Sequence, residues 1–380
     1  MSKLQELIKE LCPDGVEFKK LEEVCEIFSG KNKQKKEQGK YPVYGSTGII
    51  AYCDNYQYDK EQLLIARVGA NAGFIHIANG KYDVSDNTLI VDVIGTCNSI
   101  YIYYVLVNSN INRYSKGGGQ PLVTASDIKK IEIPLPPLEI QNEIVRILDT
   151  FTSHTAELQA ELQARKEQYE YYRNKLLTFD ENDERVKWMT LGEVSVNVCS
   201  GGTPSTSNKK YYQGHIPWLR TQEVDWKDVF YTKIKISEDA IKNSSAKIIP
   251  PNCVIVAMYG ATAGKTCINK IPLTTNQACC NLEINKDIAL YKYVYYWLYK
   301  EYYKLKALGE GSQSNISGKK IKSYAIPIPP LSEQQRIVSI LDKFESLVND
   351  LSEGLPAEIT VVQEQYEYYR NKLLTFKRKS

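Results

Sequence analysis

Mostly apolar residues recur at alternating steps of four and three through the middle of the chain. The positions are Ile144, Leu148, Phe151, Thr155, Leu158, Leu162, Arg165, Tyr169, Tyr172 and Leu176. A seam of this period, kept up for about four heptads without proline or glycine, is typical of a coiled coil. The pattern therefore predicts a helix of about 35 residues, roughly 50 Å long at the usual rise per residue.

The same seam returns near the C-terminus and is interrupted once. Its positions are Ile337, Leu341, Phe344, Val348, Leu351, Leu355, Ile359, Val362, Tyr366, Tyr369 and Leu373. Two successive steps of four add one helical turn, which is a stutter in heptad terms, and Gly354 and Pro356 lie there. Proline is tolerated in the first turn of a helix but not in its interior. We therefore expect a break near residues 352–355, a restart at Pro356, and antiparallel packing of the two helices.

Ahead of each helix the pattern changes to short apolar runs separated by glycine, asparagine and aspartate, which predicts β-strands. The runs are residues 41–44, 63–66, 73–77 and 88–91 in the first half, and 247–249, 254–257, 265–268 and 280–284 in the second. A tyrosine-rich helical pattern follows in each half, at residues 100–108 and 290–304, and then a proline-rich strand, at residues 131–137 and 324–330. The expected fold class is α+β, with two mixed α/β lobes that each lead into a long helix.

The two halves are copies of one unit. Residues 167–179, EQYEYYRNKLLTF, recur without change at residues 364–376, and weaker matches pair residues 66–73 with 257–264. A repeat of this length indicates two copies of one function, arranged as a pseudo-twofold duplication. The expected domains are a first lobe at 1–136, a central helical region at 137–179, a second lobe at 180–329 and a distal helical region at 330–380.

Composition and charge narrow the function classes. A net charge of +3 over 380 residues excludes a general binder of polyanions, so any DNA contact must come from local patches. The nine cysteines show no zinc-ligand spacing, so neither a metal nor a disulfide is expected. The chain has no signal-peptide core and no run of about 18 apolar residues, which favours a cytoplasmic protein without a membrane segment. The 28 tyrosines against 8 phenylalanines suit interfaces between helices or with nucleic acid.

Motifs for catalysis are lacking. Residues 260–266, GATAGKT, approach a phosphate-binding loop, but that motif needs four residues between its glycines and this segment is one short. A glycine-rich β-turn is the simpler interpretation, and a turn that presents Thr262 and Lys265 to a ligand is the functional one. No adenine-methyltransferase or dinucleotide-binding motif occurs. We therefore expect a non-catalytic binding module without a cofactor.

The order of these elements resembles the specificity subunit of type I restriction-modification systems across essentially the whole chain. The resemblance rests on the segments 134–138 (PLPPL) with Gln141, 155–158 (TAEL), the duplicated 169–177, 354–359 (GLPAEI) and 44–48 (YGSTG). It implies that each lobe is a target recognition domain and that the helices are the conserved spacer regions. The implied partners are double-stranded DNA, two adenine methyltransferase subunits and, for cleavage, ATP-driven restriction subunits.

Two unlike lobes on a helical pair would read the two unlike half-sites of an asymmetric, bipartite target, with the helices as a ruler. One additional helical turn would move the lobes about 6 Å, whereas one base pair advances about 3.4 Å, so the spacing would change by about one to two base pairs. A coiled-coil scaffold with two protein-binding lobes is the alternative, and it predicts no salt-dependent DNA binding. A modification-only system with another catalytic partner also remains open.

Polar side chains on the matched loops are the candidate base readers, because arginine and lysine pair with guanine while asparagine and glutamine pair with adenine. They are Tyr44, Ser46, Arg67, Asn71, Asn87 and Gln120 in the first lobe, and Thr203, Arg220, Thr221, Tyr259, Thr262, Lys265, Gln277 and Gln313 in the second. Asparagine and glycine at such positions can also simply form turns. Tyr169, Tyr172, Tyr366 and Tyr369 are candidate contacts with partner subunits, although packing within the chain explains them about as well.

Overall fold

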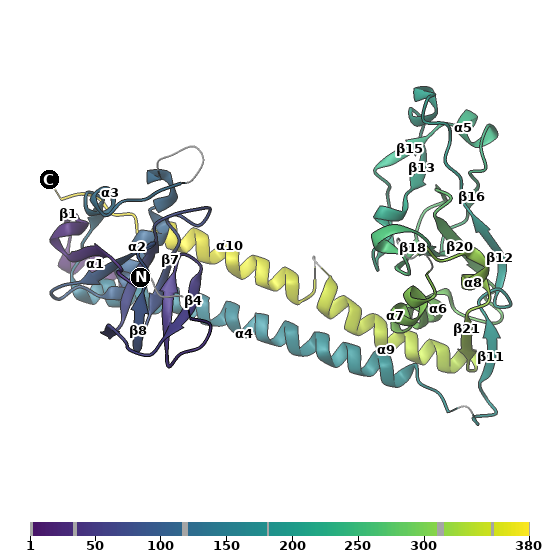
Figure 1. The fold of residues 1–380 in the computed structure, drawn as a ribbon, viewed down its shortest axis with the longest axis horizontal. Coiled ribbons are helices and arrows are strands. Elements are labelled where there is room, and N and C mark those ends of the chain that lie inside the picture. The colour runs from purple at the N-terminus through teal and green to yellow at the C-terminus, as the bar shows by residue number, and fades with distance from the viewer. Residues whose placement is uncertain are drawn as a thin grey trace. The chain divides into compact units, whose positions relative to one another are not determined.

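The computed structural model describes residues 3–32, 36–115, 121–180, 182–309, 315–350 and 353–379. It divides into two compact units (Figure 1). Unit 1 consists of Met1–Ala160 with Glu358–Ser380, and unit 2 of Glu161–Ala357. Each unit combines one lobe with two helical segments, and the long helix α4 (Leu138–Leu176) contributes to both.

The lobe of unit 1 is built on two four-stranded sheets. One has the order β2 (Cys25–Ser29), β9 (Thr88–Val93), β6 (Gln62–Ala66), β7 (Ile75–Ala78), and the other β4 (Gly48–Cys53), β3 (Tyr41–Gly45), β8 (Lys81–Val84), β5 (Tyr58–Asp59). Strand β6 is buried at every position, because α2 (Ser99–Asn108) packs against one face of its sheet and the second sheet covers the other, where Leu64 packs with Tyr82 and Val84 of β8. This explains why β6 is a continuous apolar run and not an alternating one.

The lobe of unit 2 repeats this topology. Its sheets have the orders β12 (Ser195–Ser200), β20 (Cys279–Ile284), β17 (Val254–Ala257), β18 (Thr266–Asn269), β14 (Asp228–Val229), and β15 (Ile234–Ile236), β13 (Ile216–Leu219), β19 (Leu273–Thr275), β16 (Ile248–Ile249). The parallel pair β3 with β8 recurs as β13 with β19, and the antiparallel neighbours also correspond. The duplication expected from the sequence is therefore present in the fold.

Each lobe is connected to its long helix by the same two features, a short strand pair and a buried glutamine. Two short strands, β1 (Phe18–Lys20) and β10 (Glu132–Pro134), pair in unit 1, as β11 (Lys187–Thr190) and β21 (Ala325–Ile328) do in unit 2. The buried Gln141 at the start of α4 donates to the carbonyl of Pro136 (2.8 Å) and accepts from the backbone N–H of Asn98 (2.9 Å). Gln334 makes the equivalent two bonds, both 2.9 Å long. These buried amides hold the strand, the lobe helix and the long helix together.

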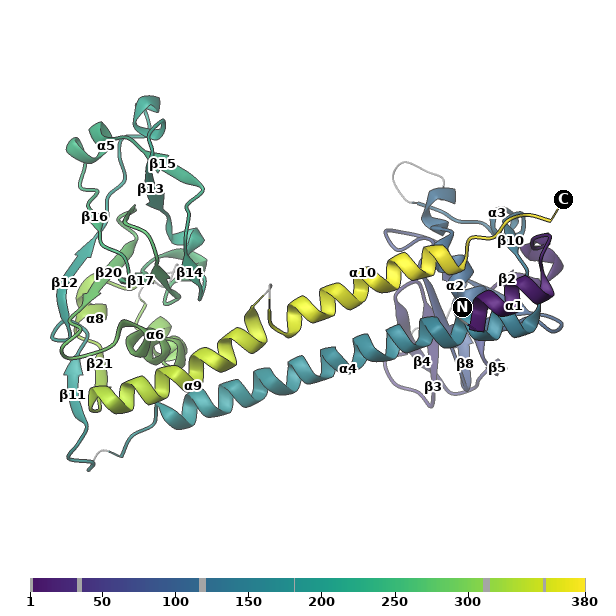
Figure 2. The ribbon, with the colours of Figure 1, turned by 180° about the vertical axis from the view of Figure 1, so that it is seen from behind.

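The long helices follow the predicted seam. Helix α4 has 39 residues, and its partners are α10 (Leu355–Leu373) in unit 1 and α9 (Leu331–Asn349) in unit 2. The ring of Phe151 stacks on Tyr369 at 5.5 Å, and the ring of Tyr172 stacks on Phe344 at 5.5 Å. The segments are antiparallel in both units, which Figure 2 shows from behind. The predicted α+β fold with antiparallel helices is confirmed.

Two helix boundaries differ from the expectation. Helix α10 begins at Leu355, one residue before Pro356, so the proline lies in the first turn, where it removes no helical hydrogen bond. The helix expected at residues 290–304 divides into α6 (Tyr291–Lys300) and α7 (Tyr302–Ala307). The buried Glu301 lies between them and accepts a hydrogen bond from the hydroxyl of Tyr324 (2.9 Å). This tertiary bond holds the carboxylate where the helix is interrupted.

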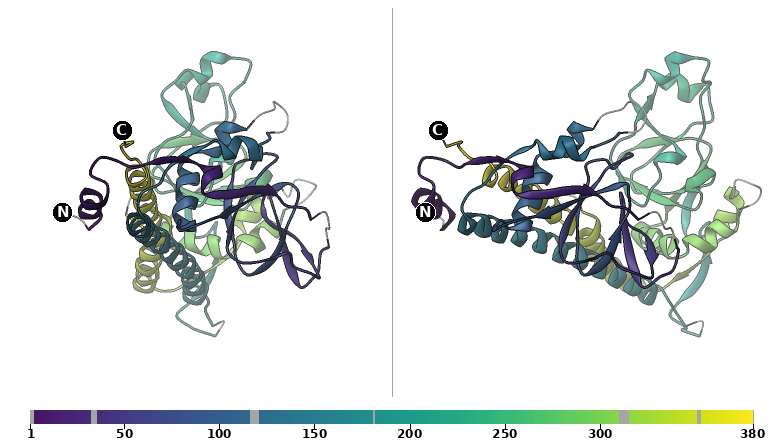
Figure 3. Two further views of the ribbon diagram at one scale, coloured as in Figure 1. Left: turned by 90° about the vertical axis from the view of Figure 1, so that its left-hand side faces the viewer. Right: turned by 60° about the vertical axis from the view of Figure 1, so that its left-hand side comes forward.

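Both described ends of the chain belong to unit 1 (Figure 3). The N-terminal helix α1 (Lys3–Leu11) carries Lys3, whose ammonium pairs with the buried carboxylate of Glu143 on α4 at 3.0 Å. The C-terminal segment returns to the lobe, where the N–H of Val16 donates to Lys377 (2.8 Å) and that of Lys379 donates to Val16 (2.9 Å). The terminal residues therefore complete the unit that contains the first lobe.

Candidate nucleic-acid interface

The two glycine-rich segments are matching hairpin turns. Residues 67–74 join β6 to β7, and residues 258–265 join β17 to β18, and each pair of strands is antiparallel. Gly69 (φ 84°), Gly73 (φ 91°), Gly260 (φ 77°) and Gly264 (φ 84°) all have the positive φ angles that glycine adopts without strain. A phosphate-binding loop opens into a helix, whereas this turn opens into strand β18. The β-turn interpretation is therefore the one that the structure supports.

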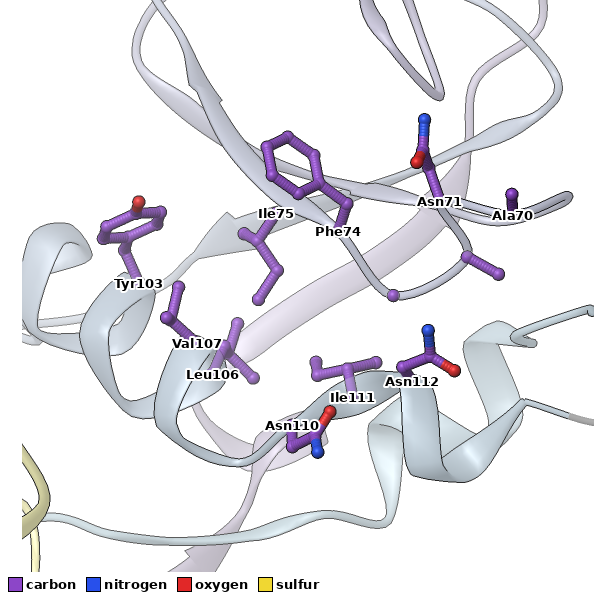
Figure 4. Close-up of a pocket in the computed structure, with 12 residues that line it drawn as sticks. Ala70, Asn71, Phe74, Ile75, Tyr103, Leu106, Val107, Asn110, Ile111 and Asn112 are labelled. Carbon is purple, nitrogen blue, oxygen red and sulfur yellow. The ribbon is translucent and has the colours of Figure 1, made fainter. Parts of the chain in front are cut away.

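The hairpin of the first lobe rests on the segment that follows α2. A Cβ atom on Gly73 would lie 2.6 Å from the backbone nitrogen of Asn112. Beside this contact lies a pocket of about 390 Å³, lined by the hairpin and by residues of α2 and η2 (Ile111–Tyr114). Figure 4 shows Asn71 pointing away from the segment that carries Ile111 and Asn112. The hairpin is thus supported on one side and exposes Asn71 on the other.

Gly73→Ala is expected to displace the hairpin of the first lobe, because both the φ angle and the approach to Asn112 oppose a side chain. Gly69→Ala is the matched control, since its φ angle is as unfavourable but a Cβ there meets nothing within 4 Å. The control should cost about 1–2 kcal/mol of unfolding free energy, and Gly73→Ala clearly more. Hydrogen exchange over residues 66–78 should accelerate only in Gly73→Ala. Equal exchange in the two variants would show that the contact does not position the hairpin.

Three of the first-lobe candidates lie on connected backbone segments. The N–H of Arg67 donates to the carbonyl of Asn87 (3.0 Å), and the N–H of Ser85 donates to the carbonyl of Tyr44 (2.9 Å). Ser85 Oγ also accepts from the N–H of Asn87 (3.2 Å). The Nε atom of Arg67 is buried and has no hydrogen-bond partner. The backbone segments that carry Arg67, Asn87 and Tyr44 therefore lie next to one another.

Two first-lobe candidates remain. Ser46 is half-buried and follows strand β3. Gln120 lies outside the described residues, as does Gln313 of the second lobe.

In the second lobe, four candidates belong to one hydrogen-bonded cluster. Thr221 donates through Oγ1 to Asn276 (3.2 Å), and Thr262 donates to the carbonyl of Thr221 (2.9 Å). Thr203 donates to the side chain of Gln277. Thr221 is buried, so it supports the cluster more than it presents a surface, whereas Tyr259 is 40% exposed.

Asn276 connects the loops of this cluster and was missed by the sequence analysis. Its Oδ1 accepts from Thr221, and its backbone N–H donates to the carbonyl of Leu219 (2.9 Å). In the first lobe, Ser85 makes the equivalent backbone bond to Tyr44 (2.9 Å). Its position beside Gln277, in a loop between two apolar strands, could have marked it as a candidate in the sequence.

The two cationic candidates of the second lobe are paired with acids. Arg220 lies 3.6 Å from Glu223, and Lys265 lies 2.6 Å from Asp225. Both acids belong to the short segment 221–225, which contains the turn η4 (Thr221–Glu223). These two candidates of the second lobe therefore each have an acidic partner, unlike a free cation.

The four tyrosines proposed as partner contacts divide by exposure. Tyr169 is 5% exposed and stacks on Phe344 at 6.2 Å. Tyr172 and Tyr366 are half-buried, whereas Tyr369 is 40% exposed. Packing within the chain therefore accounts for Tyr169. Two outward-facing residues of the duplicated segment, Tyr171 (58% exposed) and Tyr368 (59% exposed), were not among the candidates, because they lie off the seam.

A carboxyl group lies among the tyrosines of unit 2. Glu345 of α9 accepts hydrogen bonds from the hydroxyls of Tyr296 (2.7 Å) and Tyr295 (3.2 Å). Burial raises the pKa of Glu345, and the two hydroxyl donors oppose this effect without cancelling it. In unit 1 the corresponding lobe tyrosine, Tyr104, bonds to Asp149 (2.6 Å), as Tyr296 bonds to Asp342 (2.6 Å).

Glu345→Gln is expected to stabilise unit 2 at neutral and alkaline pH. The folded state holds the proton to higher pH than the unfolded chain, so the wild-type protein loses stability as pH rises from the usual carboxyl range through the raised pKa. The amide does not titrate, so the advantage should be present at about pH 8 and vanish at about pH 4. Chemical unfolding at both pH values measures it, with the exposed Glu367→Gln as control. A lower unfolding midpoint for Glu345→Gln at about pH 8 would contradict the assignment.

Other chemistry has little support in the part of the chain that the structure describes. No group of three or more histidine, cysteine, aspartate and glutamate side chains there could hold a metal ion. His76 is half-buried and packs beside the ring of Tyr44 at 5.7 Å. Among these residues, no helix combines the length and apolarity needed to cross a membrane.

Comparisons with known proteins agree on one family. Residues 13–168 and 184–361 match the family model described as the type I restriction modification DNA specificity domain. A type I restriction enzyme specificity subunit of Escherichia coli is 40% identical over 289 residues, covering 73% of this chain and 70% of that protein. A putative type I specificity subunit of Haemophilus influenzae is 33% identical over 382 residues, covering 95% and 96%. The solved S subunit of the M. genitalium type I system superposes with a TM-score of 0.61 at 16% identity, covering 95% of this chain and 96% of that chain, which shows the same fold.

Proposed function

The chain belongs to the specificity subunits of type I restriction-modification systems, and on this premise we propose that it reads an asymmetric, bipartite DNA target with one lobe for each half-site. Specificity subunits are the non-catalytic components of these systems, in keeping with the lack of catalytic motifs. One observation carries the proposal. The two lobes share their topology and their junctions with the helices, yet differ in the side chains on their matched loops.

The differences lie where base readers are expected. Arg67 corresponds to Met258, because each donates its backbone N–H at the start of the hairpin, to Asn87 (3.0 Å) and Ala278 (2.8 Å) respectively. Asn71 corresponds to Thr262 at the hairpin tip. Arginine can bind guanine and asparagine can bind adenine through two hydrogen bonds each, whereas methionine and threonine cannot. Lobes with these differences would recognise unlike sequences.

The candidate readers are proposed to act from these loops. In the first lobe the set is Tyr44, Ser46, Arg67, Asn71, Asn87 and Gln120, and in the second Thr203, Arg220, Thr221, Tyr259, Thr262, Lys265, Gln277 and Gln313. Thr221 is buried and would hold the loops in place, whereas the exposed side chains of Asn71, Asn87 and Tyr259 are available to contact bases. Asn276 joins the set as the residue that fixes the loops of the second lobe.

The helices are proposed to carry the partner subunits and to set the spacing of the half-sites. Two methyltransferase subunits would dock on the helices, and restriction subunits would join the complex for cleavage. The exposed rings of Tyr171, Tyr368 and Tyr369 favour such docking, because tyrosine packs well at interfaces while its hydroxyl keeps a polar contact. As α4 has no break over its 39 residues, its length is a suitable ruler.

Sequencing of modified adenines tests the proposal. Genomic DNA would come from cells that express this chain together with the methyltransferase encoded beside it, and from cells that express the methyltransferase alone. We expect a methylated motif with two unlike halves separated by unspecified bases, present only with this chain. No new methylation beside an active methyltransferase would instead favour a scaffold with two protein-binding lobes.

A further inference from the structure

The carboxylate of Asp225 is unexpected on a loop that is proposed to read DNA. Its side chain is 55% exposed, and its Oδ1 lies 2.6 Å from Nζ of Lys265. An exposed carboxylate beside a candidate base reader repels the phosphates of any DNA that approaches. The position of the first lobe that corresponds to Lys265 is Phe74, which carries no charge. The pairing is therefore a property of one lobe and not of the fold.

Glu223, the neighbouring acid, has a structural role. It pairs loosely with Arg220 at 3.6 Å, but it also accepts backbone N–H bonds from Arg220 (3.4 Å) and Lys233 (3.0 Å). Its side chain is only 12% exposed. Glu223 thus fastens the turn, whereas Asp225 forms no other hydrogen bond among the described residues and faces solvent.

The backbone fixes the position of Asp225. The next residue, Trp226, donates its N–H to the carbonyl of Thr266 (2.9 Å), the residue that follows Lys265. The indole of Trp226 stacks on Tyr299 at 4.3 Å, and its φ angle of 43° is rare for a residue with a side chain. Such a conformation persists only where the surroundings hold it. The carboxylate and the ammonium group therefore meet through two adjacent, fixed backbone segments.

We propose that Asp225 is a specificity-determining residue of the second lobe, and that Asp225 and Lys265 together read one G·C pair in the major groove. In that groove guanine presents acceptors, at N7 and O6, and cytosine presents the N4 donor. The ammonium group of Lys265 can donate to guanine while the carboxylate of Asp225 accepts from cytosine. On other DNA the carboxylate keeps Lys265 neutralised, so that the lysine adds little attraction for phosphates. The inference rests on the proposed function.

A purely structural role would give a different result. An exposed ion pair contributes about 0–1 kcal/mol to stability. If Asp225 served only this purpose, its removal would change the thermal midpoint slightly and leave the preference for the target unaltered. The distinguishing quantity is therefore the ratio of affinities for cognate and unrelated DNA.

The experiment compares Asp225→Asn with wild type in the full chain assembled with its methyltransferase subunits. Asp228→Asn is the matched control, because Asp228 forms a similar ion pair with Lys270 at 3.3 Å. Lys265 lies directly before strand β18 and Lys270 directly after it. Binding is measured over a range of salt concentrations to a duplex with the methylated motif and to a scrambled duplex. The double variant Asp225→Asn, Lys265→Met tests whether the freed lysine is the cause. Thermal melting confirms that each variant is folded.

Asp225→Asn should bind scrambled DNA more tightly, with a salt dependence steeper by about one counterion. The affinity ratio should fall about tenfold, within the range that one specific base contact supplies, and one G·C position of the second half-site should lose its specification. The double variant should lose the added affinity for scrambled DNA. An unchanged ratio, or the same change in Asp228→Asn, overturns the inference while leaving the proposed function intact. A wild-type complex without preference for the methylated motif overturns both.

Discussion

A chain in which residues 18–134 replace residues 188–327 should direct its methyltransferase to a symmetric motif made of two inverted copies of the first half-site. The second half of the wild-type motif should disappear, because the loops that read it are gone. The pseudo-twofold duplication gives the reason, since equivalent lobes on antiparallel helices are expected to read their half-sites in opposite directions. The motif is determined by sequencing modified adenines.

The structure supplies the junctions for this exchange. Phe18 pairs with Pro134 in the short sheet of unit 1, and Trp188 pairs with Pro327 in that of unit 2. The hydroxyl of Tyr101 donates to the carbonyl of Pro134 (2.9 Å), as Tyr293 does to that of Pro327 (2.7 Å). The grafted lobe therefore brings its own strand pair and its own tyrosine contact.

Contacts between the lobe and α9 are also duplicated. In the graft, Tyr104 would meet Asp342 in place of Asp149, and the N–H of Asn98 would meet Gln334 in place of Gln141. The reciprocal exchange, with residues 188–327 in place of 18–134, is the control and should give a symmetric motif of the second half-site. If both exchanges are folded and the wild-type motif persists in either, the lobes do not read the target.

The elements with a strong internal period could be predicted from the sequence. The seam of α4 and the break between α9 and α10 were found because heptad spacing and the pair Gly354 and Pro356 are local signals. Buried strands such as β6 and β17 were found as continuous apolar runs. Strand β4 was missed, because Ile49 and Ile50 are both exposed (51% and 42%) and give no alternation. Its pairing is specified by β3 and not by its own pattern.

Only the part of the site that is repeated in both halves of the chain could be predicted. Matching the two copies identified the hairpin turns and therefore Asn71 and Thr262. It could not show that Thr221 is buried, since that depends on a bond to Asn276 far along the chain. Nor could it show the pairing of Lys265 with Asp225, because the two residues meet only through the backbone bond beside them. Spacing in sequence reveals candidate residues, whereas exposure and pairing require the fold.

Insertion of a second Thr-Ala-Glu-Leu segment after Leu158 in α4 should lengthen the unread spacer of the target by about one to two base pairs. Four residues add about 6 Å along the helix and rotate its continuation by about 40° beyond a full turn. One base pair advances about 3.4 Å and rotates DNA by about 35°, at 10–10.5 base pairs per turn. The insertion therefore changes distance and rotation in proportions that added base pairs can match. Both half-sites should keep their sequences.

The seam explains why the insertion should have the length of a turn. Leu158 is buried in unit 1 and Tyr169 in unit 2, each on the seam, and four residues return the seam nearly to the same face. Helix α9 ends at Asn349 and α10 begins at Leu355, so no continuous helix opposite α4 is broken by the displacement.

Insertion of only two residues, Ala-Glu, is the matched control for the ruler. It rotates the continuation of α4 by about 200°, far more than the about 35° by which one added base pair rotates DNA, so methylation should be lost. Tyr169 and Tyr172 should keep their contacts with Phe344, because all three residues lie in unit 2 beyond the insertion. The motif from the four-residue variant decides the matter. An unchanged spacer with methylation retained would mean that α4 does not set the distance, because the helix would then have grown by a turn without moving the half-sites that the lobes read.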